Sequence, residues 1–315
     1  MRINTLALAA VAAPAAVMAW GDVGHRTVGY LAAKYLSPGA IELYGSLLAN
    51  DQGFDISDAA TWADTIKQKM PWSSPYHYIN PVFDDPPNNC NVTWPSDCPE
   101  KKGCVVSAIV NYTSIVLDRS SSHIDRKNAT MFLLHLIGDL HQPLHVTGYK
   151  TGGNDVEPIC WNHEPPETGG SCGGRLNLHS VWDTRIPHKL RGLPTSLDNP
   201  AEKVAAATWA EDLFARQQRT TAISECDRID AGAECILGWA RESNALVCDA
   251  VLARGEDWIL SNDLSDEYFE ENKHVVDDQI GKAGVRLAAW LNAIAVVAPP
   301  DDSKEPEMVG GGGDL

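Results

Sequence analysis

Two pairs of histidine and aspartate lie four residues apart in this chain, and the first pair belongs to a string rich in metal-binding side chains. The string reads His135-Leu-Ile-Gly-Asp139-Leu-His141-Gln-Pro-Leu-His145, and the second pair is His179 and Asp183. Residues four apart on a helix share a face, so each pair can offer an imidazole and a carboxylate to one ion. A single pair of this kind is usually only a hydrogen-bonded pair, but the repetition favours a metal site. Imidazole and carboxylate together suit zinc.

Pro143 predicts where the first of these helices ends. Proline lacks the amide hydrogen and disfavours helical geometry in the residue before it. The chain can therefore turn at this point, which lets His145 come back near the end of the helix. His141 points away from the face of His135 and Asp139, so we expect it to be a buried or supporting histidine.

The two ends of the chain indicate processing. Arg2, an apolar run from Leu6 to Val17 and the small residues around Ala19 predict a signal peptide over 1–19, so the mature chain begins at Trp20. A transmembrane helix needs about 20 apolar residues, and we expect no comparable uninterrupted run later in the chain. We therefore expect a secreted, soluble protein with no membrane partner. The acidic and glycine-rich segment 299–315 predicts a disordered tail.

Cysteines and glycosylation sequons fit an oxidising compartment. The chain has eight cysteines, for which we expect Cys98–Cys104 and Cys160–Cys172 as two of the pairs because each closes a small loop rich in glycine or proline. Three sequons make Asn91, Asn111 and Asn128 candidates for N-glycans.

The apolar spacing predicts a mainly all-α fold, with one large helical domain over 20–298. Long loops are expected over 70–100 and 148–178, with room for a short hairpin in the second. Ser57 and Asn128 are the candidate N-caps. Trp182, Trp239, Trp258 and Trp290 sit at helical spacing and are expected in the core. The expected helices span 24–36, 57–68, 105–117, 128–140, 202–215, 238–258 and 275–297.

The formal net charge of −17 at first argues against a polyanionic partner such as nucleic acid. Bound metal ions are often the largest local charges in a site. A metal cluster can therefore make a cleft positive while the outer surface remains acidic, and binding of a polyanion would then be local and metal-dependent.

Further motifs carry a family resemblance. Trp20-Gly-Asp-Val-Gly-His25, Trp62-Ala-Asp64-Thr-Ile-Lys67 and Pro75-Tyr-His77-Tyr78-Ile-Asn80 precede the His135 string, and Lys282-Ala-Gly-Val-Arg-Leu-Ala-Ala-Trp-Leu291 closes the pattern. In this order the motifs resemble the secreted zinc-dependent single-strand-specific nucleases of the S1/P1 type, known from fungi and plants. The likeness runs from Trp20 to about Ala298.

The resemblance implies a helical fold with a trinuclear zinc cleft. Asp64, His77, His135 and Asp139 would hold one zinc, and His145, His179 and Asp183 a second. The third zinc would be held by His25, Asp139 and Trp20, the last through its free amine and carbonyl. An α-amine titrates near about 7.7 to 8.0, so a neutral chelating amine is accessible after the signal peptide leaves. Simple packing of a buried aromatic is the other reading of Trp20.

The resemblance also implies a reaction. Zinc-activated hydroxide would attack phosphorus and release 5′-phosphorylated products from single-stranded DNA and RNA, with 3′-nucleotides as further substrates. Asp64 would act at the metal, and Lys67 would contact the phosphoryl oxygens. Tyr78 would stack on a base, with Asn80 and Asn154 as polar contacts. Family members carry phenylalanine and aspartate at the first two of these positions, which predicts an altered base preference here.

Two alternatives remain. A secreted zinc phospholipase C shares the N-terminal tryptophan and a trinuclear cluster, although its ligand set ends in glutamate where this chain has Asp183. A non-catalytic glycoprotein that uses zinc only for stability is the second. Structural zinc sites are typically closed sets of four ligands, whereas the group His145, His179 and Asp183 offers only three side chains.

Overall fold

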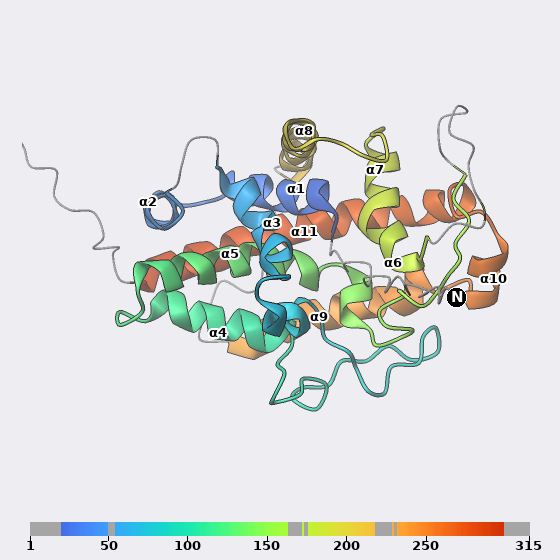
Figure 1. The fold of residues 1–315 in the computed structure, drawn as a ribbon, viewed down its shortest axis with the longest axis horizontal. Helices are drawn as coiled ribbons and strands as arrows, with labels where there is room; N and C mark the ends of the chain where they lie inside the picture. The colour runs from blue at the N-terminus through green and yellow to red at the C-terminus, as the bar shows by residue number, and fades with distance from the viewer. Residues whose placement is uncertain are drawn as a thin grey trace, which may run out of the picture.

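Two long helices, α5 and α11, run side by side through the centre of the protein (Figure 1). The computed structural model describes residues 20–49, 54–162, 172, 176–217, 229 and 232–298. The predicted signal peptide over 1–19 and the predicted tail over 299–315 lie outside these described residues. The α-helices are α1 (Asp22–Ala33), α2 (Pro38–Leu47), α3 (Ile56–Ile66), α4 (Val105–Leu117), α5 (His123–Leu140), α6 (Leu178–Ser180), α7 (Ile186–Leu190), α8 (Asn199–Gln217), α9 (Gly232–Leu246), α10 (Glu256–Ser261) and α11 (Glu267–Val297).

Short 3₁₀-helical and π-helical segments connect several of these helices. The 3₁₀ turns are η1 (Pro71–His77) and η2 (Pro143–Val146), and the π turns are η3 (Val181–Arg185) and η5 (Val247–Val251). Around the central pair, α4 packs on α5, and α1 packs on α3, α8 and α11. The mainly all-α fold is confirmed.

Helix boundaries differ from the prediction where a cap lies further upstream. Asp55, and not Ser57, caps α3, since its Oδ1 accepts the backbone N–H of Ser57 at 2.9 Å. Ser122, and not Asn128, caps α5, since its hydroxyl accepts the N–H of Asp125 at 3.2 Å. The first turns of both helices mix one isoleucine with polar residues, so the apolar spacing did not mark them clearly.

Two other helix predictions were wrong. The sequence analysis missed α2, where Ser37 caps the helix and Pro38 occupies its first turn. The single helix expected over 238–258 is instead α9, the π turn η5 and α10, with Gly255 at a φ of +76° immediately before α10. A positive φ favours glycine and ends helical geometry.

The expected hairpin in the loop 148–178 is reduced to two backbone hydrogen bonds among the described residues. Ile159 N–H donates to the Leu176 carbonyl at 2.8 Å, and Leu178 N–H donates to the Val156 carbonyl at 3.0 Å. Pro158 lies between these contacts and has no N–H to extend a ladder. Across the described part of the chain there is no sheet, only isolated bridges.

Disulfides tie loops to the helical body. Cys98–Cys104 and Cys160–Cys172 are confirmed, and the structure adds Cys90–Cys248, which the sequence analysis missed. The last pair joins the loop after η1 to the π turn η5 across a sequence separation of 158 residues. No local sequence pattern predicts a disulfide between two cysteines so far apart in the chain.

Among the predicted core tryptophans, Trp182, Trp239 and Trp290 are buried, and Trp258 packs partly buried against the core. One helix of the described chain, α11, is long and apolar enough to cross a membrane by length and composition. Lys282 and Arg286 interrupt its apolar sequence, so it is not an uninterrupted apolar run of the kind found in 6–17. Half of the apolar window of α11 is buried inside the protein, which is typical of a core helix.

Candidate metal centre and active site

Eight predicted side chains from seven different elements meet at one end of α5. They form three groups. Within each group, one nitrogen or oxygen atom from every residue lies within 4.8 Å of the corresponding atoms of the others. The groups are His25, His135 and Asp139; Asp64, His77 and His135; and His145, His179 and Asp183. Since His135 is shared, the first two groups are directly connected.

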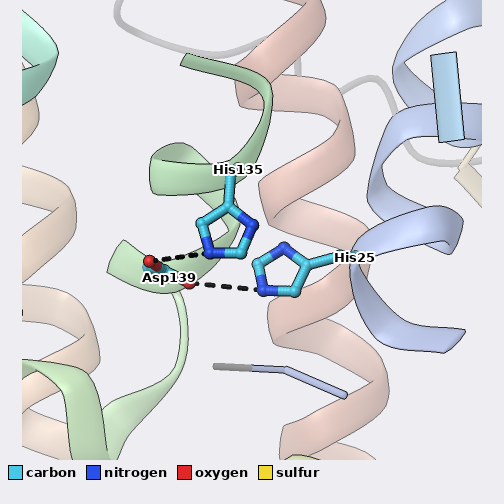
Figure 2. Close-up of side chains that lie close together, drawn as sticks. All are labelled: His25, His135 and Asp139. Atoms are coloured by element: carbon cyan, nitrogen blue, oxygen red, sulfur yellow. Dashed lines mark ion pairs between the residues drawn. The ribbon is translucent and has the colours of Figure 1, made fainter. Parts of the chain in front are cut away.

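The first group joins α1 to α5 (Figure 2). His25 Nε2 lies 3.3 Å from Asp139 Oδ1, and His135 Nε2 lies 3.3 Å from Asp139 Oδ2. The two imidazole rings stack with their centroids 3.9 Å apart. Gly138 permits this approach, because a Cβ there would stand 2.9 Å from His25 Nδ1.

The second group adds Asp64 from α3 and His77 from the end of η1. His77 Nδ1 lies 2.9 Å from Asp139 Oδ2 and 3.8 Å from Asp64 Oδ1. His135 Nε2 lies 3.8 Å from Asp64 Oδ2. Asp139 thus faces the histidines of both groups, as expected for a carboxylate that bridges two ions.

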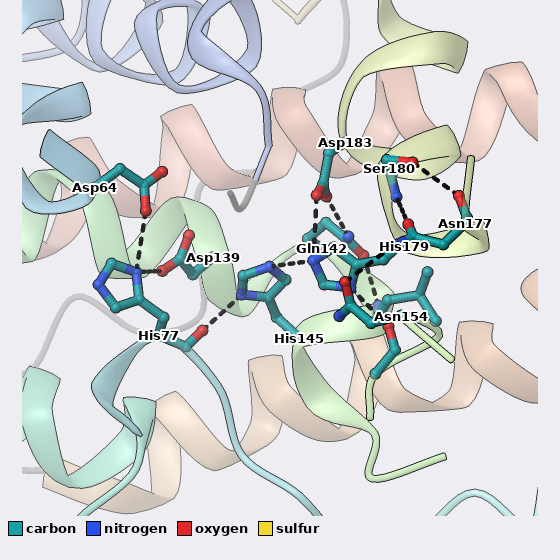
Figure 3. A network of polar contacts seen from close by, with 12 residues as sticks. Asp64, His77, Asp139, Gln142, His145, Asn154, Asn177, His179, Ser180 and Asp183 are labelled. Atoms are coloured by element: carbon teal, nitrogen blue, oxygen red, sulfur yellow. Dashed lines mark hydrogen bonds and ion pairs between the residues drawn. The ribbon is translucent and has the colours of Figure 1, made fainter. Parts of the chain in front are cut away.

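The third group is built from the turn η2 and from the short helix α6 with its π turn η3 (Figure 3). His145 Nε2 lies 3.2 Å from His179 Nε2, which in turn lies 3.2 Å from Asp183 Oδ2. π turns occur often at functional sites. Pro143 starts η2 and so lets His145 return toward the cluster, as predicted.

Backbone carbonyls fix the orientation of three of these imidazoles. The Nδ1 atoms of His135, His145 and His179 donate to the carbonyls of Ala60, His77 and Gly152 at 2.7, 2.6 and 2.6 Å. In the neutral form of each ring, Nε2 then carries no proton and is directed into the cluster, an arrangement found around most metal-bound histidines. Gly152 is needed here, since its φ is +62° and a Cβ would lie 2.7 Å from the Leu144 carbonyl oxygen.

Several atoms of the cluster have no hydrogen-bond partner although they are buried. They include both ring nitrogens of His25, Nε2 of His77 and Oδ1 of Asp139. Buried polar atoms without partners are rare and costly in folded proteins. Nitrogen and oxygen donors that converge in this way fit metal ions, so the donor set provides a metal-binding site.

The electrostatics of the cluster favour the ligand forms of some side chains and oppose those of others, since the surrounding aspartates raise the pKa of His135 to about 9 despite its burial. Burial lowers the pKa of His145 to about 3, which keeps that ring neutral. Burial opposes ionisation of Asp139, but the histidines around it outweigh burial and hold its pKa well below the ordinary value. Burial raises the pKa of Asp183 well above its ordinary value, so its ionised form needs a nearby cation.

Lys67, the predicted phosphate-binding residue, contacts a donor side chain, and the predicted base-binding residues lie on segments that adjoin the donors. Lys67 Nζ lies 3.0 Å from Asp64 Oδ1. The segment after His77 runs beside His145, since Ile79 N–H donates to the His145 carbonyl at 2.9 Å, and so places the half-buried Tyr78 and exposed Asn80 next to the donors.

Asn154 lies two residues after the carbonyl that orients His179, and its Nδ2 donates to the Thr151 carbonyl at 2.8 Å. Its Oδ1 accepts from Asn177, the N-cap of α6, at 3.4 Å. The loop that carries Asn154 is therefore joined to the helix that carries His179.

Trp20 lies immediately before α1, with its side chain fully buried. The next peptide N–H, that of Gly21, donates to the Asp183 carbonyl at 2.9 Å. The start of the predicted mature chain therefore lies against the segment of the third donor group.

Two further buried residues, His141 and Gln142, follow the donor pair on α5. His141 is buried outside the three groups, where Nδ1 contacts the Ile137 carbonyl and Nε2 contacts Arg286, as expected for a supporting histidine. Gln142 was missed by the sequence analysis, although it contacts Asp183. Only its position between His141 and Pro143, within the string of metal-binding side chains, could have identified Gln142 as a residue of the site.

Comparisons with known proteins agree with this site. The model of the S1/P1 nuclease family matches residues 20–296. The chain is 34% identical to Nuclease S1 of Aspergillus oryzae over 302 residues, which cover 93% of this chain and 98% of that protein. It is 35% identical to Nuclease P1 of Penicillium citrinum over 283 residues, with 87% and 97% covered.

The similarity extends to plants. The chain is 31% identical to Endonuclease 2 of Arabidopsis thaliana over 296 residues, which cover 87% of this chain and 90% of the relative. The family match begins at Trp20 and spans all three donor groups. The chain belongs to the S1/P1 nuclease family and is a hydrolytic nuclease with a metal-binding site.

Proposed function

We propose that this protein is a zinc-dependent endonuclease that cleaves single-stranded DNA and RNA to 5′-phosphorylated products and also hydrolyses 3′-nucleotides. The observation that carries the proposal is the set of three adjacent donor groups, built from buried histidines and aspartates. Zinc bound there supplies Lewis acidity and lowers the pKa of a bound water to about 7.

The proposal assigns residues to three zinc ions, and the three donor groups support it. Asp64, His77, His135 and Asp139 hold one ion, and His145, His179 and Asp183 hold a second. The third is held by His25 and Asp139 together with the amine and carbonyl of Trp20. Mixed nitrogen and oxygen donors of this kind suit zinc.

Asp64 and Lys67 act on the reacting phosphate. Lys67 is mostly buried, and its ammonium is held 3.0 Å from the Asp64 carboxylate. This contact positions the positive charge beside the metal donors, where it stabilises the negative charge on phosphoryl oxygens. Asp64 thereby combines a metal-binding role with orientation of the lysine.

Tyr78, Asn80 and Asn154 bind the nucleotide. The Tyr78 ring stacks on a base, which is worth roughly 1 to 3 kcal/mol and tolerates any sequence. The amides of Asn80 and Asn154 supply hydrogen bonds to the base edge. A base within a duplex has no free face for stacking, which explains the preference for single strands.

We further propose that the protein is secreted and carries N-glycans. The eight cysteines and the signal-like segment 1–19 support export. Asn91 and Asn111 are exposed, whereas Asn128 is half-buried on α5, so the first two are the favoured glycan sites. The burial of α11 supports a protein without a membrane partner.

The proposal is tested with zinc-loaded mature protein on four substrates: a single-stranded oligonucleotide, the same sequence as a duplex, a 3′-mononucleotide and phosphatidylcholine. We expect cleavage of the single strand with 5′-phosphate ends and release of phosphate from the mononucleotide. Asp139→Asn should abolish both activities, whereas Asp212→Asn, which changes an exposed aspartate in a surface ion pair with Arg191, should leave them intact.

Two outcomes contradict the proposal. Hydrolysis of phosphatidylcholine without nucleotide hydrolysis indicates a zinc phospholipase C. A zinc-loaded protein with no hydrolytic activity on any of the four substrates indicates a protein that uses zinc only for stability.

A further inference from the structure

Gln142 lies between the two pairs of histidine and aspartate and is completely buried. It directly follows His141, the C-cap of α5, and the turn η2 begins at the next residue. A buried amide needs partners for both its N–H₂ group and its oxygen. The partners of Gln142 therefore indicate what it does.

Both ends of the Gln142 side chain are engaged within the site (Figure 3). Its Nε2 donates to Asp183 Oδ1 at 2.6 Å, and its Oε1 accepts the Leu144 N–H at 2.5 Å. One end thus reaches a predicted ligand in η3, and the other secures the turn that leads to His145.

The two oxygens of Asp183 have different surroundings. Oδ1 accepts from Gln142, whereas Oδ2 lies 3.2 Å from His179 Nε2. The backbone of Asp183 is also held, since its carbonyl accepts from Gly21 at 2.9 Å. With one oxygen occupied and the main chain anchored, the carboxylate has a fixed orientation in which Oδ2 faces the histidines.

We propose that Gln142 is a positioning residue that presents a single oxygen of Asp183 to the zinc ion held by His145, His179 and Asp183. The inference rests on the proposed function for the presence of that ion. Loss of a hydrogen-bond partner behind a metal ligand typically weakens metal affinity by about 10- to 100-fold.

Two variants separate the contacts of Gln142. Gln142→Met keeps the shape of the side chain and removes both hydrogen bonds. Gln142→Glu keeps an acceptor for the Leu144 N–H and removes the donor to Asp183. Gln279→Met is the matched control, because Gln279 is an equally buried glutamine that contacts the His141 carbonyl and Ser243, and neither is in a donor group.

The measurement is zinc stoichiometry and affinity of the mature protein in metal buffers, together with the thermal unfolding temperature of each metal-free protein. We expect both Gln142 variants to bind one zinc about 10- to 100-fold more weakly than wild type, and the remaining zinc ions normally. Gln279→Met should retain wild-type affinity at every site. Metal-free unfolding temperatures close to that of Gln279→Met exclude a general folding defect as the cause.

Wild-type zinc affinity in both Gln142 variants overturns this inference alone. So does wild-type affinity in Gln142→Glu only, because the Leu144 contact would then account for the effect. A wild-type protein that binds no zinc overturns the proposed function together with this inference.

Discussion

The carboxylate of Asp139 lies within 3.3 Å of imidazole nitrogens from α1, η1 and α5. It is completely buried, and one of its oxygens has no hydrogen-bond partner. A charged group is stable in such a place only if positive charge or hydrogen-bond donors compensate the loss of water. The histidines around Asp139 supply part of that compensation, and a metal ion held by the same side chains would supply more.

Asn80 is the residue at which we predict a change in base preference. An amide both donates and accepts hydrogen bonds, whereas a carboxylate only accepts. Asn80→Asp should therefore change the relative rates at which the four 3′-mononucleotides are hydrolysed. Asn80 is exposed, so the substitution should leave stability unchanged within about 0.5 kcal/mol. Indistinguishable base profiles for the two proteins would remove Asn80 from the base-binding site.

Local spacing accounts for part of the site and tertiary contact for the rest. His135 with Asp139, and His179 with Asp183, were predictable because residues four apart share a helix face. His25, Asp64 and His77 followed only from the family resemblance. Gln142 was not predictable, since its contact with Asp183 joins residues 41 positions apart, one at the start of η2 and the other in η3.

The helices α1, α3 and α8 are joined by a partly buried group of charges that lies outside the donor groups. Asp58 on α3 accepts from Arg26 on α1 at 2.9 Å and from Lys203 on α8 at 2.6 Å. Burial opposes ionisation of Asp58, but Lys203 and Arg26 outweigh it and lower its pKa. The folded protein therefore binds a proton at Asp58 less readily than the unfolded chain.

This lowered pKa predicts a pH-dependent contribution to stability. The contribution is complete above the ordinary pKa of about 3.9 and is lost as the pH falls through the lower folded-state value. Asp58→Asn should cost about 1 to 3 kcal/mol at pH 7, and the difference from wild type should shrink in acid. Urea unfolding of metal-free protein at several pH values checks this. Glu211→Gln, at a pair with an exposed carboxylate, should cost less than about 1 kcal/mol.

The disulfides should differ in their contributions because they close loops of different length. Cys90–Cys248 spans 158 residues, whereas Cys98–Cys104 spans 6. The chain-entropy relation gives about 5 kcal/mol for the longer loop and about 2 kcal/mol for the shorter. Replacing each pair by serines and measuring the free energy of unfolding tests the order. A larger loss from the Cys98–Cys104 replacement would contradict it.

The helical architecture was predictable because most apolar faces follow the period of an α-helix. The helix boundaries were harder to predict, since Asp55 and Ser122 cap first turns in which a single isoleucine stands among polar residues. The pairing of Cys90 with Cys248 depends on how the loop after η1 packs on η5, and no local pattern encodes that packing.

The whole chain combines a formal charge of −17 with a site that should bind a polyanion. Metal ions reconcile these properties, because they supply positive charge locally while the surface stays acidic. Removal of zinc with a chelator should therefore abolish binding of single-stranded oligonucleotide as well as its cleavage. Fluorescence anisotropy with a labelled oligonucleotide measures the binding. Unchanged affinity after complete zinc removal would contradict this source of attraction.

Processing at Trp20 should control the metal content of the protein. A free amine can bind zinc in its neutral form, whereas the nitrogen of a peptide bond is no comparable ligand. Protein that retains residues 1–19 should hold one zinc fewer than mature protein and show little nuclease activity. Zinc content and activity, measured before and after removal of the segment, check this expectation. Equal zinc content in both forms would exclude the terminal amine as a ligand.

The most direct measurement is anomalous X-ray diffraction from crystals of the zinc-loaded mature protein at the zinc absorption edge. We predict three peaks: one beside His25, Asp139 and the Trp20 amine, one among Asp64, His77, His135 and Asp139, and one among His145, His179 and Asp183. The absence of anomalous peaks at these donor groups, or zinc bound only elsewhere on the protein, would contradict the account.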